Sequence, residues 1–149
     1  MTLTALETGL HKIESSRERK NTLNILYDQC KSGTVPAARV LHIITNNIEH
    51  ETAVDVLQDT LRFIVPCILN NYLHEEVWES KKSQMFDLVM RILHSGRFEE
   101  YPSAIETLVT SAVSFAVTQS EVVLVSKWFQ AGKIFDSEGA TIRGASINV

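Results

Sequence analysis

Residues 34–72 constrain the fold of this chain more than any other segment, because they predict two amphipathic helices joined by a short turn. A turn at Ser32-Gly33-Thr34 precedes them, and Pro36 suits the first turn of a helix, where its missing N–H breaks no hydrogen bond. We expect the first helix to break at Asn46-Asn47 and the second to begin at Glu51-Thr52. Apolar residues recur at helical spacing in both: Ala37, Leu41, Ile44 and Ile48, then Val54, Leu57, Leu61, Ile64, Ile68 and Tyr72.

Pro66 lies inside the second of these helices. A proline there removes one backbone donor, and its ring collides with the carbonyl of the residue four positions earlier. We therefore expect the helix to kink or split near residues 62–65.

The rest of the chain follows the same helical pattern, marked by start and stop signals. Four pairs have the spacing of a capping box, in which a hydroxyl and a carboxylate satisfy free N–H groups at a helix start: Thr4 with Glu7, Ser15 with Glu18, Ser103 with Glu106, and Thr118 with Glu121. Glycines at 33, 96 and 132 are the expected stops. Many β-branched residues between 109 and 125 favour strands, but two of the boxes and the apolar positions 105, 108, 112 and 115 favour helices there.

About seven helices with short connections predict an all-α fold, because such helices pack against their sequence neighbours. The expected pairs cover residues 3–31, 36–72 and 77–117, close to the repeat of roughly 40–47 residues in HEAT and armadillo proteins. We therefore expect an irregular α-solenoid of antiparallel helix pairs. Residues 1–149 would form a single helical domain, with an irregular tail at 133–149. Because an open solenoid end exposes apolar surface, we expect this domain to be a fragment of a longer protein.

Composition and charge exclude several functional classes. Of the 149 residues, 44% are hydrophobic and 21% charged, which is typical of globular domains. The net charge is −4 and no basic stripe with interleaved aromatics exists, so we expect no nucleic-acid partner. The densest basic group, residues 17–20, is interpreted as a solvated helix face.

Cys30 and Cys67 are 37 positions apart, each among apolar neighbours, and are expected to be core thiols in a reducing compartment. No apolar run reaches the ~18 residues that a membrane span needs. The first ten residues lack the basic start and apolar centre of a signal peptide. We expect a cytoplasmic protein with no membrane partner.

The order of residue types in residues 34–72 resembles one helix pair in the C-terminal helical domain of zinc aminopeptidases of the aminopeptidase N family. The resemblance extends from about residue 3 to residue 147. Its stronger points are Ser32-Gly33-Thr34-Val35-Pro36-Ala37, Glu51 with Val56-Leu57-Gln58, and the segment from Trp128 to Gly144. It implies a HEAT-like helical domain of a metallopeptidase that removes N-terminal amino acids from peptides by zinc-assisted hydrolysis. The zinc and the catalytic residues would lie in an upstream domain, over which the helical domain closes as a bowl and restricts the access of the peptide substrate.

The zinc motif of that family, His-Glu-x-x-His, places two imidazoles one helical turn apart with a general base between them. His50-Glu51 is followed at the required position by Val54, and His74-Glu75 by Trp78, so neither pair completes the motif. We assign no catalytic, cofactor-binding or metal-binding residue to this chain. The zinc cofactor is expected only in the parent enzyme's catalytic domain.

Other polar and aromatic residues are interpreted as structural. The five histidines (11, 42, 50, 74 and 94) are expected at the surface or at helix ends. Two carboxylate groups, Asp55 with Asp59 and Glu75 with Glu76 and Glu79, could line an acidic cavity, although a solvated helix face is favoured. We expect Trp78 and Trp128 to anchor the core or a groove, and Met85 and Met90 to lie in the core.

These observations favour a helical domain of an aminopeptidase that is inactive when isolated. Two alternatives remain open at this point. The chain could be a stand-alone HEAT-like scaffold that holds another protein in its groove, or a small regulatory helical bundle.

Overall fold

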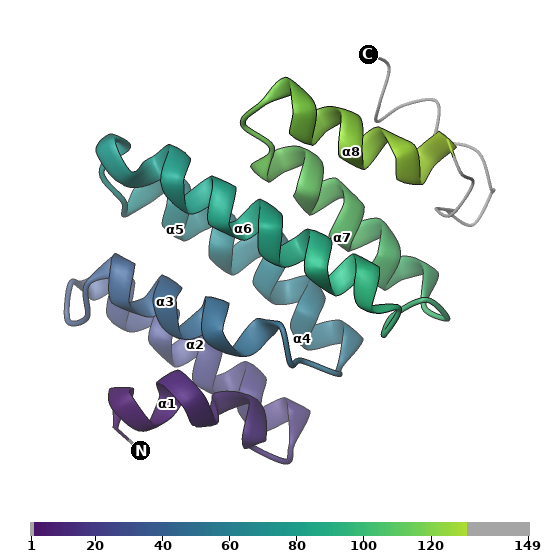
Figure 1. Ribbon diagram of the computed structural model, residues 1–149. Coiled ribbons are helices and arrows are strands. Elements are labelled where there is room, and N and C mark those ends of the chain that lie inside the picture. The colour runs from purple at the N-terminus through teal and green to yellow at the C-terminus, as the bar shows by residue number, and fades with distance from the viewer. Residues whose placement is uncertain (1, 131–149) are drawn as a thin grey trace. The chain divides into compact units, whose positions relative to one another are not determined.

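The computed structural model describes residues 2–130, and within that range every regular element is helical, which confirms the all-α class (Figure 1). The helices are α1 (Leu3–Gly9), the 3₁₀ turn η1 (Leu10–Lys12), α2 (Ser16–Ser32), α3 (Ala37–Ile48), α4 (Val54–Asp59), the π-helical turn η2 (Thr60–Ile64), α5 (Val65–Asn71), α6 (Glu75–Ser95), α7 (Pro102–Phe115) and α8 (Gln119–Gln130). Counted with α4, η2 and α5 as one helix, the described residues form the seven helices that the sequence predicts. Gly132 and the tail at 133–149 lie outside the described residues.

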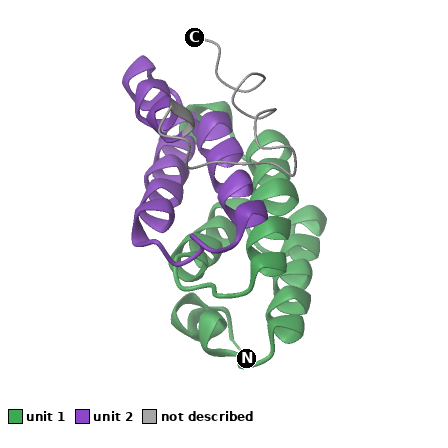
Figure 2. Ribbon diagram, turned by 90° about the vertical axis from the view of Figure 1, so that its right-hand side faces the viewer, with its two compact units in different colours: residues 1–78 green, residues 79–149 purple. Residues whose placement is uncertain are grey.

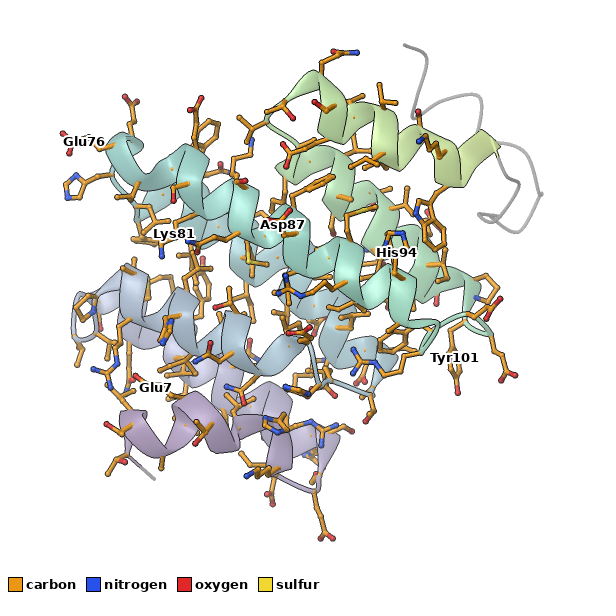
Figure 3. The ribbon with its side chains drawn as sticks, in the orientation of Figure 1. Glu7, Glu76, Lys81, Asp87, His94 and Tyr101 are labelled. Carbon is orange, nitrogen blue, oxygen red and sulfur yellow. The ribbon has the colours of Figure 1, made fainter. Side chains whose placement is uncertain are left out.

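The chain divides into two compact units, residues 1–78 and residues 79–149 (Figure 2). In the first unit α1 packs against α3, and α3 packs also against α2 and α5. An ion pair between Glu7 on α1 (labelled in Figure 3) and Arg39 on α3, at 3.1 Å, joins the first of these helix pairs. The first helix therefore makes its main helix contact with α3, while the turn η1 that follows it packs against α2.

The buried side chains of α3 and of the helix that follows it lie on the stripes that the sequence predicts, although Ala37 and Val54 of those stripes are only half-buried. Leu23, Leu26 and Cys30 of α2 are buried, as are Leu41, Ile44 and Ile48 of α3, and Leu57, Leu61, Ile64 and Ile68 of the following helix. Tyr72, the last member of that stripe, is exposed, because the helix ends at Asn71.

The ends of these helices agree with the predicted signals in part. Ser15 Oγ accepts a hydrogen bond from Glu18 N at 3.3 Å, and Gly33 ends α2 in the left-handed region with φ 80°. The first helix is capped by Thr2, whose Oγ1 accepts from Ala5 N at 3.1 Å, and not by Thr4. This correction follows from a helix that begins at Leu3 and so places Thr4 inside its first turn.

The helix α3 does not break at Asn46-Asn47 but continues to Ile48. Asparagine is a common turn residue because its side chain competes for backbone hydrogen bonds. Here Asn47 is 2% exposed, and its amide bonds to α1 and to the Ile43 carbonyl oxygen of its own helix without displacing an N–H of α3, so the helix continues through it.

The interruption predicted before Pro66 is present as the π-helical turn η2. Within it Val65 N donates to Thr60 O, five residues back instead of four. Buried side chains along this helix come in pairs that recur every four residues: Val56 and Leu57, Thr60 and Leu61, Ile64 and Val65, Ile68 and Leu69. In an α-helix, residues four positions apart are rotated by about 40° from one another around the helix axis, so a buried stripe with this repeat turns gradually away from the core. The π turn holds more residues per turn and so reduces this rotation, at the place where Pro66 also removes a backbone donor.

The second unit contains α7, α8 and most of α6. Its core includes Phe86, Val89 and Leu93 of α6 and Val125 of α8, together with all four apolar positions predicted for α7: Ile105, Leu108, Ala112 and Phe115. Thr118 and Glu121 form the predicted capping box reciprocally, with Glu121 N donating to Thr118 Oγ1 at 3.2 Å and Thr118 N to Glu121 Oε1 at 3.0 Å. Ser103 is not a cap, because α7 already begins at Pro102 and Tyr101 precedes it.

None of the helices within residues 2–130 combines the length and the apolar character that crossing a membrane requires.

Candidate functional site

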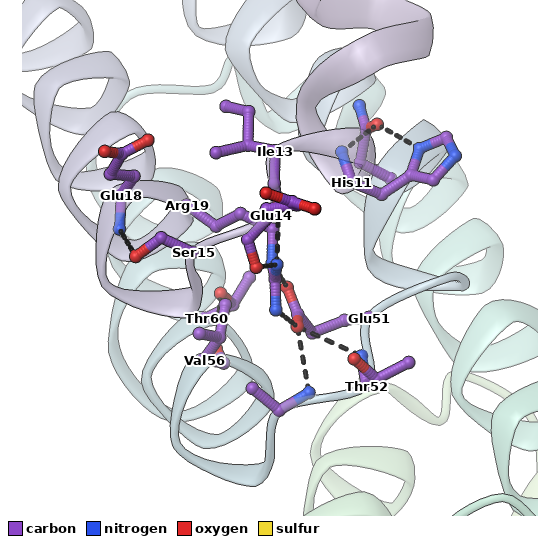
Figure 4. A network of polar contacts seen from close by, with 12 residues as sticks. His11, Ile13, Glu14, Ser15, Glu18, Arg19, Glu51, Thr52, Val56 and Thr60 are labelled. Carbon is purple, nitrogen blue, oxygen red and sulfur yellow. Dashed lines mark hydrogen bonds and ion pairs between the residues drawn. The ribbon is translucent and has the colours of Figure 1, made fainter.

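The most extensive polar cluster of the first unit centres on an ion pair between Arg19 on α2 and Glu51 in the turn before α4 (Figure 4). Two parallel hydrogen bonds join the side chains: Arg19 Nε to Glu51 Oε1 at 3.0 Å and Arg19 Nη2 to Glu51 Oε2 at 2.8 Å. Arg19 is 6% exposed and Glu51 3%. This bidentate geometry is the strongest form of an arginine–carboxylate contact.

Backbone groups satisfy much of the remaining hydrogen-bonding capacity of this pair. Arg19 Nη1 donates to the carbonyl oxygens of Ile13, at 2.6 Å, and Glu14, at 3.1 Å. Glu51 Oε2 accepts from the N–H groups of Thr52 and Ala53, at 3.0 and 2.9 Å. The pair therefore ties the connection between α1 and α2 to the start of α4.

The interpretation of residues 17–20 as a solvated face is wrong for Arg19. Arg19 lies four positions before Leu23, on the stripe that α2 buries, so its charged group enters the interior. Its neighbour Lys20 pairs with Asp59 at 2.9 Å, and both of those side chains are 38% exposed. The hydrogen bond and the charge of Asp59 raise the pKa of Lys20.

Asn47, in the last turn of α3, is the second centre of the cluster. Its Nδ2 donates to the carbonyl oxygens of Leu6 at 2.9 Å, Glu7 at 3.2 Å and Ile43 at 2.8 Å. Two of these carbonyls belong to α1, a helix of seven residues; Leu6 O also accepts from Leu10 N, whereas the last carbonyls of a helix generally lack a partner within it. The Asn47 amide therefore caps α1 from a different helix.

The oxygen of the same amide binds His11. Asn47 Oδ1 accepts from His11 N at 3.0 Å and lies 2.8 Å from His11 Nδ1. The imidazole ring of His11 lies against that of His50, with the ring centres 4.6 Å apart and the planes tilted by 33°. Two of the five histidines thus meet beside the buried ion pair, which their wide spacing in the sequence does not indicate.

A second cluster in the same unit contains both cysteines. A side-chain hydrogen bond with Cys67, together with burial, raises the pKa of Tyr27 to about 12. The Tyr27 ring also meets the Tyr72 ring edge to face at 6.4 Å. Both thiols are free; Cys30 is buried, as predicted, and burial raises its pKa, whereas Cys67 is only half-buried.

The predicted carboxylate groups are not brought into one cluster with these residues. Asp55, Glu75, Glu76 and Glu79 are exposed, and Asp59 is held by Lys20. Trp78 is half-buried, whereas Met85 and Met90 are in the core as predicted.

In the second unit, His94 on α6 (labelled in Figure 3) lies with Nδ1 2.7 Å from the Met90 carbonyl oxygen. Its ring meets the half-buried Trp128 edge to face at 5.5 Å.

The two His-Glu pairs do not fit a catalytic zinc site. His50 and Glu51 lie in the turn before α4, and Glu51 is fully engaged with Arg19 and two backbone N–H groups. His74 directly precedes α6. Within residues 2–130 no three His, Cys, Asp or Glu side chains gather in a metal-binding arrangement.

The chain matches no family model, no curated protein and no solved structure.

Sequence reasoning missed the roles of Arg19 and Asn47, although a signal for both exists. Each occupies an apolar stripe: Arg19 is in register with Leu23 and Leu26, and Asn47 with Val40 and Ile44. A polar residue at a core position requires a buried partner. The identity of the partner could not be read, since Glu51 is 32 residues from Arg19 and Leu6 is 41 from Asn47.

Proposed function

We propose that this chain is a non-catalytic helical domain of a zinc-dependent aminopeptidase of the aminopeptidase N type. In that role it would restrict the access of peptides to an active site carried elsewhere in the same polypeptide. Zinc would be bound by the catalytic domain of the parent enzyme, and the peptide substrate and the other domains of the polypeptide would be its partners.

The observation that carries this proposal is the position of Glu51. Glu51 is one of the residues on which the resemblance to the aminopeptidase helical domain rests, and its carboxylate is 3% exposed and bonded to Arg19, Thr52 and Ala53. A carboxylate with these partners stabilises the junction between successive helices and is not available as a general base. This supports a structural, non-catalytic role for the His50-Glu51 pair of this chain.

The helix contacts of the first unit support the finer proposal of an irregular, HEAT-like α-solenoid. Besides the contact of α2 with α3, next-but-one helices touch: α1 with α3, and α2 with α4. Stacked helix pairs produce this pattern, because equivalent helices of successive pairs lie side by side.

Two measurements test the proposal. The purified chain, assayed with aminoacyl chromogenic substrates and added zinc, should give no hydrolysis above buffer, whereas robust hydrolysis that survives further purification would contradict it. The genomic reading frame should continue upstream of Met1 and contain a His-Glu-x-x-His sequence. An in-frame stop codon directly upstream would exclude the parent enzyme.

A stand-alone interaction scaffold is the second candidate, and two exposed apolar side chains favour it. Ile25 on α2 is 56% exposed and Phe63 in the π turn 63%. Contiguous exposed apolar patches, and not single side chains, mark surfaces that another protein covers, so this candidate requires Ile25 and Phe63 to belong to one such patch. The upstream reading frame separates the two candidates, because the scaffold requires a gene that starts at Met1.

A further inference from the structure

We propose that His11 and His50 together bind a late first-row divalent cation, for which Ni²⁺ is the probe of choice. The site is independent of the zinc proposed for a parent enzyme, and it uses only residues of the first unit.

The hydrogen bonds of Asn47 fix the protonation pattern of His11. Asn47 Nδ2 faces three carbonyl oxygens, so the amide cannot be turned around without placing its oxygen against them. Asn47 Oδ1 therefore faces His11, and His11 Nδ1 must carry a proton to donate to it. In the neutral ring this leaves the Nε2 lone pair free. Metal-binding histidines are oriented in the same way, with the second ring nitrogen donating to a carbonyl or carboxylate oxygen.

The second imidazole is held nearby by the same residue. His50 N donates to the Asn47 carbonyl oxygen at 3.0 Å, so the side chain of Asn47 orients one ring and its main chain positions the other. The ring centres are 4.6 Å apart. Two imidazoles bound at right angles to one cation through bonds of the usual length have their ring centres about 4.5 Å apart. The His50 side chain is exposed and can rotate to direct a ring nitrogen at the cation.

The geometry also selects the class of cation. Imidazole nitrogen suits Ni²⁺ and Cu²⁺ better than Mg²⁺ or Ca²⁺, and Ni²⁺ and Cu²⁺ accept adjacent ligands at right angles in tetragonal coordination. Within the described residues no third His, Cys, Asp or Glu joins the two rings, so water would complete the coordination. The nearby charges of Arg19 and Glu51 compensate each other at 2.8 Å.

Titration calorimetry of the full chain with Ni²⁺ tests the proposal. We expect one site per chain, no heat with Mg²⁺, and an increase in Tm that depends on Ni²⁺ concentration, because a ligand of the native state stabilises it. Ni²⁺ is preferred to Cu²⁺ because a free thiol such as Cys67 reduces Cu²⁺. Replacing one imidazole abolishes the chelate and should weaken binding on the order of 100-fold or more.

His50→Ala is the decisive variant, because His50 is exposed and its replacement should leave the fold intact, which circular dichroism will verify. The matched control is His42→Ala, which removes an exposed histidine of α3 whose ring contacts Asn46. Unchanged Ni²⁺ affinity in His50→Ala, or an equal loss in His42→Ala, would overturn the proposal. A nitrogen NMR spectrum that shows neutral His11 protonated at Nε2 would remove its structural basis.

Discussion

Arg19 and Glu51 show how a single pair of side chains can join distant parts of a helical chain. The two charges are almost completely withdrawn from water, and each is compensated by the other and by backbone groups. Such a pair contributes little net stability relative to a well-packed apolar pair, but the loss of one partner leaves a buried charge without compensation. The consequences of single and double replacement should therefore differ.

Glu51→Gln should lower the free energy of unfolding by about 3–5 kcal/mol, because it strands the Arg19 guanidinium in the interior. The double variant Arg19→Met with Glu51→Leu should recover only part of that loss, because it removes the uncompensated charge but also leaves four backbone groups without their side-chain partners. Urea unfolding followed by circular dichroism measures both. If the double variant is as unstable as Glu51→Gln, the ion pair stabilises the fold more than an apolar pair does, which would contradict this expectation.

Tyr27 provides a pH-dependent contribution to stability. Its pKa is raised from 10.0 to about 12 in the folded chain by the hydrogen bond with Cys67 and by burial. A raised folded pKa means that the contribution is complete below pH 10 and is lost as the pH rises toward 12. Tyrosinate absorbance should show an ionisation step near pH 12 that Tyr27→Phe removes. Tyr101→Phe, at an exposed site, should leave that step in place.

At the scale of single residues, the sequence indicates which positions are buried better than it indicates their partners. The stripe that contains Leu23 and Leu26 also contains Arg19, so its burial was predictable. Its pairing with Glu51 was not, because helical periodicity describes one helix at a time and carries no information on contacts 32 residues apart.

At the scale of the helix, the interruption before Pro66 was predictable in position but not in form. Proline accounts for a disturbed turn near residue 62, and the structure has a π turn at Thr60–Ile64. The four-residue repeat of buried pairs is the signal that distinguishes a π turn from a simple kink. Helix starts were less predictable, since Thr4 and Ser103 satisfy the spacing of a cap yet lie inside the first turns of α1 and α7.

Deletion of Phe63 should leave the fold intact, because the π turn holds one residue more than an α-helical turn requires, with a loss of about 3 kcal/mol as Pro66 then lies in a regular α-helix. After the deletion the buried pairs are separated by four, three and four residues, the spacing of an uninterrupted amphipathic α-helix. The variant should keep cooperative urea unfolding and the wild-type helix content.

Deletion of Ile25, which is also exposed, is the matched control. It rotates the following residues of α2 by about 100° and turns Leu26 and Cys30 away from the core. This variant should lose most of its native stability, which is about 5–15 kcal/mol for a typical domain. An equal loss of stability in the two deletion variants would show that the additional residue of the π turn is required for the fold.

At the scale of the whole molecule, the division into residues 1–78 and 79–149 predicts that a mutation destabilises mainly the unit in which it lies. Hydrogen exchange separates regions that open independently. In the Glu51→Gln variant, the backbone amides of α2 and α3 should lose protection from hydrogen exchange. The amides of α7 should keep theirs, because α7 belongs to the other unit. Equal loss in α7 would show that the two units unfold as one.

The helical class of the molecule was readable from apolar periodicity, because each helix carries its own pattern. The packing of α1 against α3 was not readable, since it depends on the side chains of both helices and on the Asn47 cap. The solenoid arrangement stays a prediction, and the upstream reading frame will decide the peptidase role.

The Asn47 cap also affects the order in which the helices can form during synthesis. A helix of seven residues is too short to persist alone in water, and the group that caps α1 is 41 residues further along the chain. At a synthesis rate of about 5–20 residues per second, those residues take about 2–8 s to be added. Throughout that interval α1 has no stable partner, so on a translating ribosome this segment must wait for α3 before it can hold its helical form.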